Sequence, residues 1–164
     1  MELGSMGKSS LDSNVYDFPL VRGRIAITIV DTVNRQQISY IEQDNLITTE
    51  GLNAIAAGVA GTSLTPFYVM VGTGTTTPTL ADTGLATADV TTWKPVTGVS
   101  ALGSSVYYGM VYGSATANGT WTEIGLWRNA TATANTGTLV ARALVPWTKN
   151  STQVATVNWT WTVV

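Results

Sequence analysis

Apolar and polar residues alternate with the period of a β-strand along much of this chain. Isoleucine occupies every second position within 24–30, and Val and Trp alternate with Asn and Thr within 157–163. Because successive side chains of a strand point to opposite faces, each segment predicts a strand with one buried face. The strand that closes the chain, 154–164, should present its threonine-rich face to solvent or to a neighbouring subunit.

Further strands are expected in apolar segments bounded by turn residues: 38–41, 67–71, 105–112, 121–127 and 138–145. Their spacing of about 8–12 residues is typical of β-sandwiches and small barrels. Asn118-Gly119 is a pair that tight hairpin turns favour, directly before the strand at 121–127. We therefore predict an all-β domain, either a β-sandwich or a jelly-roll-like small barrel, of about eight strands.

One segment, 49–58, carries the pattern of a short helix. Thr48 or Thr49 can cap its start, and Glu50 lies in the first turn, where the helix dipole favours an acid. One face carries four apolar residues: Leu52, Ile55, Ala56 and Val59. We expect the helix to bury this stripe against one end of the sheet.

The start of the chain differs in composition from the rest. The first 13 residues are polar and rich in Gly and Ser, whereas 15–21 is more apolar and is interrupted by Pro19. We predict an extended N-terminal arm over 1–23 and a single domain over 24–164. The large side chains that would bind a partner from this arm are Tyr16, Phe18 and Leu20.

The amino-acid composition excludes several kinds of functional site. The chain has no cysteine and no histidine, so it has no disulfides or thiolate zinc sites, and it lacks the commonest general base. Its charged fraction is 11% and its net charge is −2, which argues against a nucleic-acid surface. No apolar segment approaches the ~20 residues of a membrane span, and no signal-peptide core is present. The 28 threonines favour an all-β protein, because threonine is a strand former that remains polar. The low charge weakens protection against association and suits a chain that acts in an assembly.

The stretch 67–85 predicts a buried strand that is followed by a long loop. An apolar strand at 67–71 is followed by Gly72 and Gly74 and then by a long polar loop. A phosphate-binding loop would need a Gly-Lys-Ser/Thr ending and a following helix, and neither is present. We interpret the glycines as a turn that ends the strand.

Glu123 is a carboxylate within an apolar strand. It could serve as a catalytic acid, but a glycosidase needs a second carboxylate nearby and the other acids lie in scattered loops. We interpret Glu123 as structural, paired with Arg142 or Arg128 or accepting loop amides. A loop calcium site at Asp82 or Asp89 is a lesser alternative. We assign no catalytic, cofactor-binding or metal-binding residue.

Six tryptophans raise the possibility of binding sugars, because exposed indole rings stack on carbohydrate. Trp159 and Trp161 lie on the apolar face of a strand and should be core residues. Trp93 and Trp147 lie in turn contexts close to proline, and we predict them to be exposed anchors for a protein interface or a glycan.

Several segments, in this order, resemble a family of small tailed-phage virion proteins described as head-decoration, tail or fibre components: Asn45-Leu46-Ile47 with Gly51-Leu52, 67–74, Pro78, 82–85, 123–127, 137–142, Pro146, Lys149 and 159–162. The resemblance covers roughly 45–164. It implies a β-sandwich, frequent homotrimers and no enzymatic activity.

These expectations combine into one hypothesis. The chain is predicted to be a non-enzymatic virion protein, assembled in the host cytoplasm, that decorates the capsid as a cement protein. Its arm and its oligomeric contacts would bind the major capsid protein or another virion protein. The alternatives are a tail, baseplate or fibre component, and a carbohydrate-binding β-module with a glycan as its partner.

Overall fold

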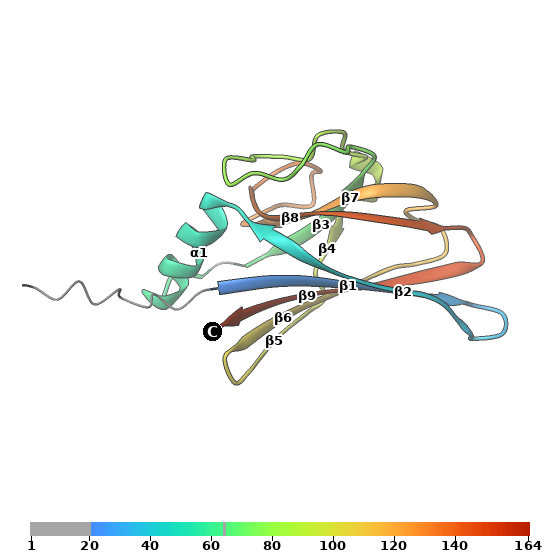
Figure 1. The fold of residues 1–164 in the computed structure, drawn as a ribbon, viewed down its shortest axis with the longest axis horizontal. Helices are drawn as coiled ribbons and strands as arrows, with labels where there is room; N and C mark the ends of the chain where they lie inside the picture. Colours follow the sequence, from blue (N-terminus) through green and yellow to red (C-terminus); the bar gives the residue numbers. More distant parts are fainter. Residues whose placement is uncertain (1–20, 64) are drawn as a thin grey trace, which may run out of the picture.

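In the part of the chain that the structure describes, nine antiparallel strands form one continuous sheet that curls into a half-barrel, with one α-helix at one end (Figure 1). The computed structural model describes residues 21–63 and 65–164. The strands are β1 (Val21–Asp31), β2 (Gln37–Ile47), β3 (Phe67–Gly72), β4 (Lys94–Pro95), β5 (Gly98–Leu102), β6 (Ser105–Tyr112), β7 (Gly119–Arg128), β8 (Thr138–Lys149) and β9 (Gln153–Val163). The prediction of an all-β small barrel is confirmed.

The strand order is β4-β3-β7-β8-β2-β1-β9-β6-β5, and β2 joins two limbs of the sheet. The upper limb consists of β4, β3, β7 and β8, and the lower limb consists of β1, β9, β6 and β5. Most of β2 pairs with β1, the strand before it in the chain, as an antiparallel hairpin. Its last two residues, Leu46 and Ile47, pair instead with Arg142 and Ala141 of β8. Figure 1 shows β2 running from the lower limb towards β8 in the upper one. The two limbs are thus parts of one curled sheet.

The main core fills the space between the limbs. Ile25, Ile27 and Ile29 of β1 are at most 1% exposed, as their alternation predicts. They belong to one cluster with buried residues of β3, β7, β8 and β9, among them Val69 and Trp159. A smaller cluster contains Met70, Trp93, Trp127, Ala130 and Leu139, with Leu85 packed against it. Because Met70 alternates with Val69, this second cluster lies on the other face of β3.

Helix α1 (Thr49–Val59) begins where the sequence predicts, with the Thr48 side chain accepting a hydrogen bond from the Gly51 amide at 3.1 Å. The predicted buried stripe is largely wrong, because only Ile55 of its four residues packs against the main core. Leu52 is 45% and Val59 88% exposed, and the helix instead buries Gly51 and Ala54. The reason is close packing on β8: a Cβ on Gly51 would lie 2.1 Å from the Val140 carbonyl oxygen.

The hairpin expected at Asn118-Gly119 is also wrong. β6 pairs with β5 and β9, whereas β7 pairs with β3 and β8, so the segment between them crosses from one limb to the other. Positive φ angles at Ala117 (52°) and Gly119 (148°) shape this crossing. The turn residues are there, but they connect strands that are not neighbours.

The domain begins earlier than the predicted residue 24. β1 starts at Val21, which pairs with Val163 of β9, so 21–23 belongs to the sheet. Gly23 is buried there, and the close approach of Asn45 leaves no room for a side chain, because a Cβ would lie 2.4 Å from it. The proposed arm residues Tyr16, Phe18 and Leu20 lie outside the described residues.

The burial pattern makes a direct prediction for two apolar residues. Ile27→Ala should lower the free energy of unfolding by about 2–5 kcal/mol, because it leaves a cavity in the main core. Leu52→Ala should change it by about 0.5 kcal/mol or less, because much of that side chain is exposed. Urea unfolding followed by tryptophan fluorescence measures both. Equal losses would mean that the helix packs through its apolar stripe after all.

Candidate functional site

A long loop, 73–89, follows β3 and leads to the short 3-10 helix η1 (Val90–Thr92). Figure 1 shows this loop in green beside β7 and β8 in the upper limb. The residue that holds it is Glu123 of β7, which is fully buried. Its neighbour Ile124 points into the main core, so the alternation of the strand directs Glu123 towards the loop.

The Glu123 carboxylate accepts hydrogen bonds from three backbone amides of this loop. Oε1 accepts from the Gly74 amide at 2.9 Å and the Thr87 amide at 2.7 Å, and Oε2 accepts from the Ala86 amide at 3.0 Å. Gly74 lies near the start of the loop and the other two lie near its end. One side chain therefore ties both ends of the loop to β7.

Arg142 of β8 completes the arrangement. Its Nε and Nη2 donate to Glu123 Oε2 at 3.1 and 2.7 Å, and its Nη1 donates to Asp82 Oδ2 at 2.6 Å. Nη2 also donates to the Thr76 carbonyl at 3.0 Å. Arg142 is 2% exposed. We call Glu123, Arg142 and Asp82 the loop clamp. The prediction that Glu123 pairs with an arginine and accepts loop amides is confirmed, and the partner is Arg142.

Asp82 fixes the middle of the loop. Its carboxylate also accepts hydrogen bonds from the Thr79 hydroxyl at 2.7 Å and the Thr79 amide at 3.1 Å. Burial by itself would raise the pKa of Asp82, but the hydrogen bonds from Thr79 and Arg142 outweigh it, so the pKa lies below its usual value. The charged form of Asp82 is therefore part of the folded loop.

The two glycines after β3 are required by close approach. A Cβ on Gly74 would lie 2.3 Å from Glu123 Oε1, and a Cβ on Gly72 would lie 2.2 Å from the Thr87 carbonyl oxygen. The Gly74 amide donates to Glu123, and the Thr73 amide donates to Thr87. Both amides thus have hydrogen-bond partners within the protein, which agrees with a turn that ends the strand.

The polar groups of the clamp and of Asp89 are engaged in contacts within the fold. The Glu123 oxygens already accept five N–H groups and have no exposed surface, so a bound molecule has no access to them. Asp89, the other acid considered for calcium, accepts from the Thr91 amide and hydroxyl and so caps η1. Within the described residues, no group of three or more acids could hold a metal ion.

The prediction that Trp93 and Trp147 are exposed is wrong. Trp93 is 9% exposed, stacks on Tyr68 with ring centroids 5.0 Å apart, and donates from Nε1 to the Thr131 carbonyl at 2.9 Å. Trp147 is 3% exposed and stacks on Tyr112 at 6.2 Å. Pro95 ends the two-residue strand β4 and Pro146 lies within β8, and neither proline turns the nearby indole outwards. The carbohydrate-binding alternative thus loses the anchors on which it depended.

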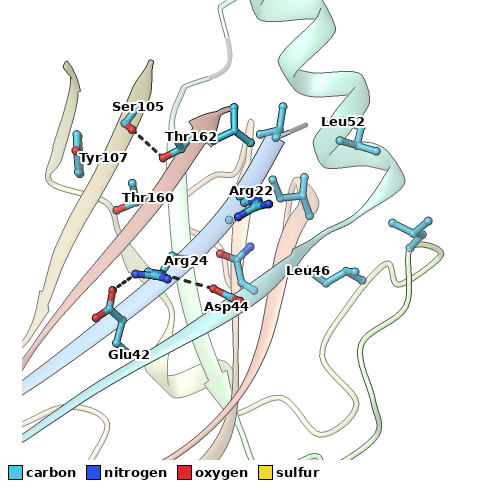
Figure 2. A pocket seen from close by; sticks show the side chains of 16 residues that line it. Arg22, Arg24, Glu42, Asp44, Leu46, Leu52, Ser105, Tyr107, Thr160 and Thr162 are labelled. Atoms are coloured by element: carbon cyan, nitrogen blue, oxygen red, sulfur yellow. Dashed lines mark hydrogen bonds and ion pairs between the residues drawn. The ribbon is translucent and has the colours of Figure 1, made fainter. Parts of the chain in front are cut away.

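A groove of about 920 Å³ lies beside the loop, and the sequence did not reveal it. Figure 2 shows its wall of strand residues, including Arg24, Asp44, Tyr107 and Thr160, with Leu52 of α1 opposite. Arg24 spans Glu42 at 2.8 Å and Asp44 at 3.5 Å. The groove is assembled from β1, β2, β6, β9, α1 and the loop, which are far apart in the chain. The available signal was the opposite charge of Arg24 and Asp44, which the structure places opposite each other in the ladder of β1 and β2.

The chain is thus a β-rich, barrel-like domain with a surface loop that the clamp holds in place. Comparison with family models, with curated proteins and with solved structures finds no match to this chain. Among the described residues, no helix has the length and apolar character needed to cross a membrane.

The clamp predicts a contrast between two arginines. Arg142→Gln should lower the free energy of unfolding by about 3–5 kcal/mol, because it leaves the Glu123 charge buried without its partner. Arg24→Gln should leave stability nearly unchanged, because its ion pairs are in water. Chemical unfolding of both variants checks this. A small effect of Arg142→Gln would show that the loop amides alone satisfy Glu123.

The clamp also predicts a dependence on pH. The pKa of Asp82 is lowered on folding, so its contribution is complete above the pKa of an unfolded Asp, about 3.9, and is lost as the pH falls through the folded pKa. Asp82→Asn should be less stable than wild type at neutral pH, and its stability should fall less steeply below about pH 4. Thermal unfolding between neutral and acidic pH measures this. Parallel profiles would contradict a charged Asp82 in the folded loop.

Proposed function

We propose that this chain is a non-enzymatic structural protein of a tailed-phage particle that decorates the capsid as a cement protein. The proposal is carried by one observation: residues from several segments that resemble phage virion proteins contact one another in the folded chain. Gly74, Asp82, Glu123 and Arg142, which lie far apart in the chain, meet in the loop clamp. In a structural protein such motifs would hold a surface in shape, and that is what these residues do here.

A second meeting of these segments supports the same interpretation. Gly51 packs α1 onto Val140 of β8, and both residues lie in resembling segments. The Thr49 amide also donates to the Leu80 carbonyl at 2.9 Å, which connects the start of the helix to the clamped loop. Helix, loop and β8 thus form one rigid end of the domain. The motifs account for contacts within the fold.

A rigid surface suits attachment to a particle. Leu80 and Val90, at 53% and 52% exposure, lie on or directly after the clamped loop and offer apolar area to a partner. Burying apolar surface contributes about 25 cal/mol per Å². A loop that is already ordered before binding does not lose its conformational entropy in the complex, so less of this free energy is offset. Many copies on one particle would each add such a contact across the junctions between capsid subunits.

The proposal makes a prediction for attachment. The purified chain should co-sediment with empty capsids of its source particle at a fixed stoichiometry. A variant lacking residues 1–20, and the double variant Phe18→Ala/Leu20→Ala, should lose this attachment while keeping the wild-type unfolding temperature, since β1 begins at Val21. Leu80→Ser, on the clamped loop, tests whether the loop contributes to the same contact.

Three outcomes separate the proposal from its alternatives. Binding to purified tails, with none to capsids, would place the chain among tail or baseplate components. Binding to neither particle, with binding to a glycan, would favour the carbohydrate-binding module. A truncated variant that fails to fold would mean that residues 1–20 belong to the domain and would overturn the proposed arm. Antibody labelling of the intact particle gives an independent view of head against tail.

A further inference from the structure

The two edges of the sheet are built differently. One edge is β4, which has only two residues, Lys94 and Pro95. A short strand, a lysine and a proline are the devices by which natural sheets prevent an edge from pairing with another chain. The other edge is β5, whose five residues form a regular ladder with β6.

β5 has none of these protections. All five of its residues are exposed, and none is charged or a proline. The neutral stretch is longer than the strand, because no Asp, Glu, Lys or Arg occurs anywhere from 95 to 122. Alternate N–H and C=O groups of β5 point away from β6, as in any edge strand, and are available to a further strand. Figure 1 shows β5 as the outermost strand beneath β6.

The same hairpin concentrates exposed apolar side chains. Val99 and Leu102 of β5 are 51% and 74% exposed. On β6, Tyr107 and Val111 are 38% and 52% exposed. Val99 shares the face of its ladder partner Tyr108, whereas Leu102 lies on the other face with Tyr107, so exposed apolar area flanks the free backbone groups on both faces. The edge offers hydrogen bonds and apolar area in the same place.

We propose that β5 pairs with β5 of a second copy of this chain, antiparallel and across a two-fold axis. The pairing would join two nine-stranded sheets into one. A second copy fits for two reasons. The edge is neutral, so two copies approach without repulsion, and β4 is protected, so a head-to-tail contact between unlike edges is disfavoured. The remaining contact is between the β5 edges of two copies, which is an isologous contact because the same surface is used on both.

This contact does not depend on where the protein acts. It would exist in the purified chain whether or not the chain binds capsids, so it can fail while the proposed function stands, and the reverse. It also differs from the homotrimer that the family resemblance implies, because a two-fold contact joins copies in pairs. The mass in solution separates the two.

Ser100 is the position at which to test the pairing. It is the middle residue of β5, so two strands paired around their centres place the two Ser100 side chains opposite each other. Like charges directly opposite in a sheet are destabilising, and opposite charges are stabilising. Ser100 is exposed, so a longer side chain there leaves the fold of one copy intact.

The experiment uses light scattering after size-exclusion chromatography of the full chain. The wild type should have twice the 17.3 kDa mass of one copy. Ser100→Lys and Ser100→Glu should each lose the dimer, and an equal mixture of the two should regain it. Val33→Lys, at an 84% exposed position outside β5 and β6, adds the same charge and should remain a dimer.

The result that would overturn the proposal is equally definite. A monomeric wild type would show that β5 does not bind a second copy under these conditions. A trimer, or a dimer that persists in both Ser100 variants, would place the contact elsewhere on the molecule. Circular dichroism of each variant confirms that any change in mass is not caused by unfolding.

Discussion

The buried pair of Glu123 and Arg142 is the interaction on which the arrangement of the upper limb depends. Taking a carboxylate and a guanidinium out of water is costly unless every remaining donor and acceptor is satisfied. Here the loop satisfies them, with its amides on Glu123 and with Asp82 and Thr76 on Arg142. The loop thus makes the buried charges tolerable, and the charges give the loop its one conformation. Neither half of this arrangement would persist without the other.

The sequence predicted Arg142 or Arg128 as the partner of Glu123 because of an unusual local pattern. An acid among apolar residues of a strand must be neutralised, and an arginine in another apolar strand is the simplest partner. The alternation of isoleucines in β1 was informative for the same reason, since one strand carries the whole signal. For β1 the alternation within the segment was enough, and its three isoleucines are buried as predicted.

The errors share a different cause, which is contact between elements distant in the chain. Gly51 rotates α1 because it touches Val140, and nothing within the helix indicates this. Trp93 is buried because Tyr68 and Trp127 come to it from β3 and β7. The groove joins strands, helix and loop in a way that no single segment predicts. Propensity describes a segment, whereas these features depend on which segments meet.

The way Glu123 holds the loop has a consequence for a protein without cysteine. A disulfide between the two ends of a loop stabilises it by limiting the conformations of the open chain, but it requires an oxidising compartment. The carboxylate joins Gly74 to Ala86 and Thr87 by hydrogen bonds alone. It acts as a cross-link that is independent of redox state, forms as the sheet folds, and opens again without breaking a covalent bond.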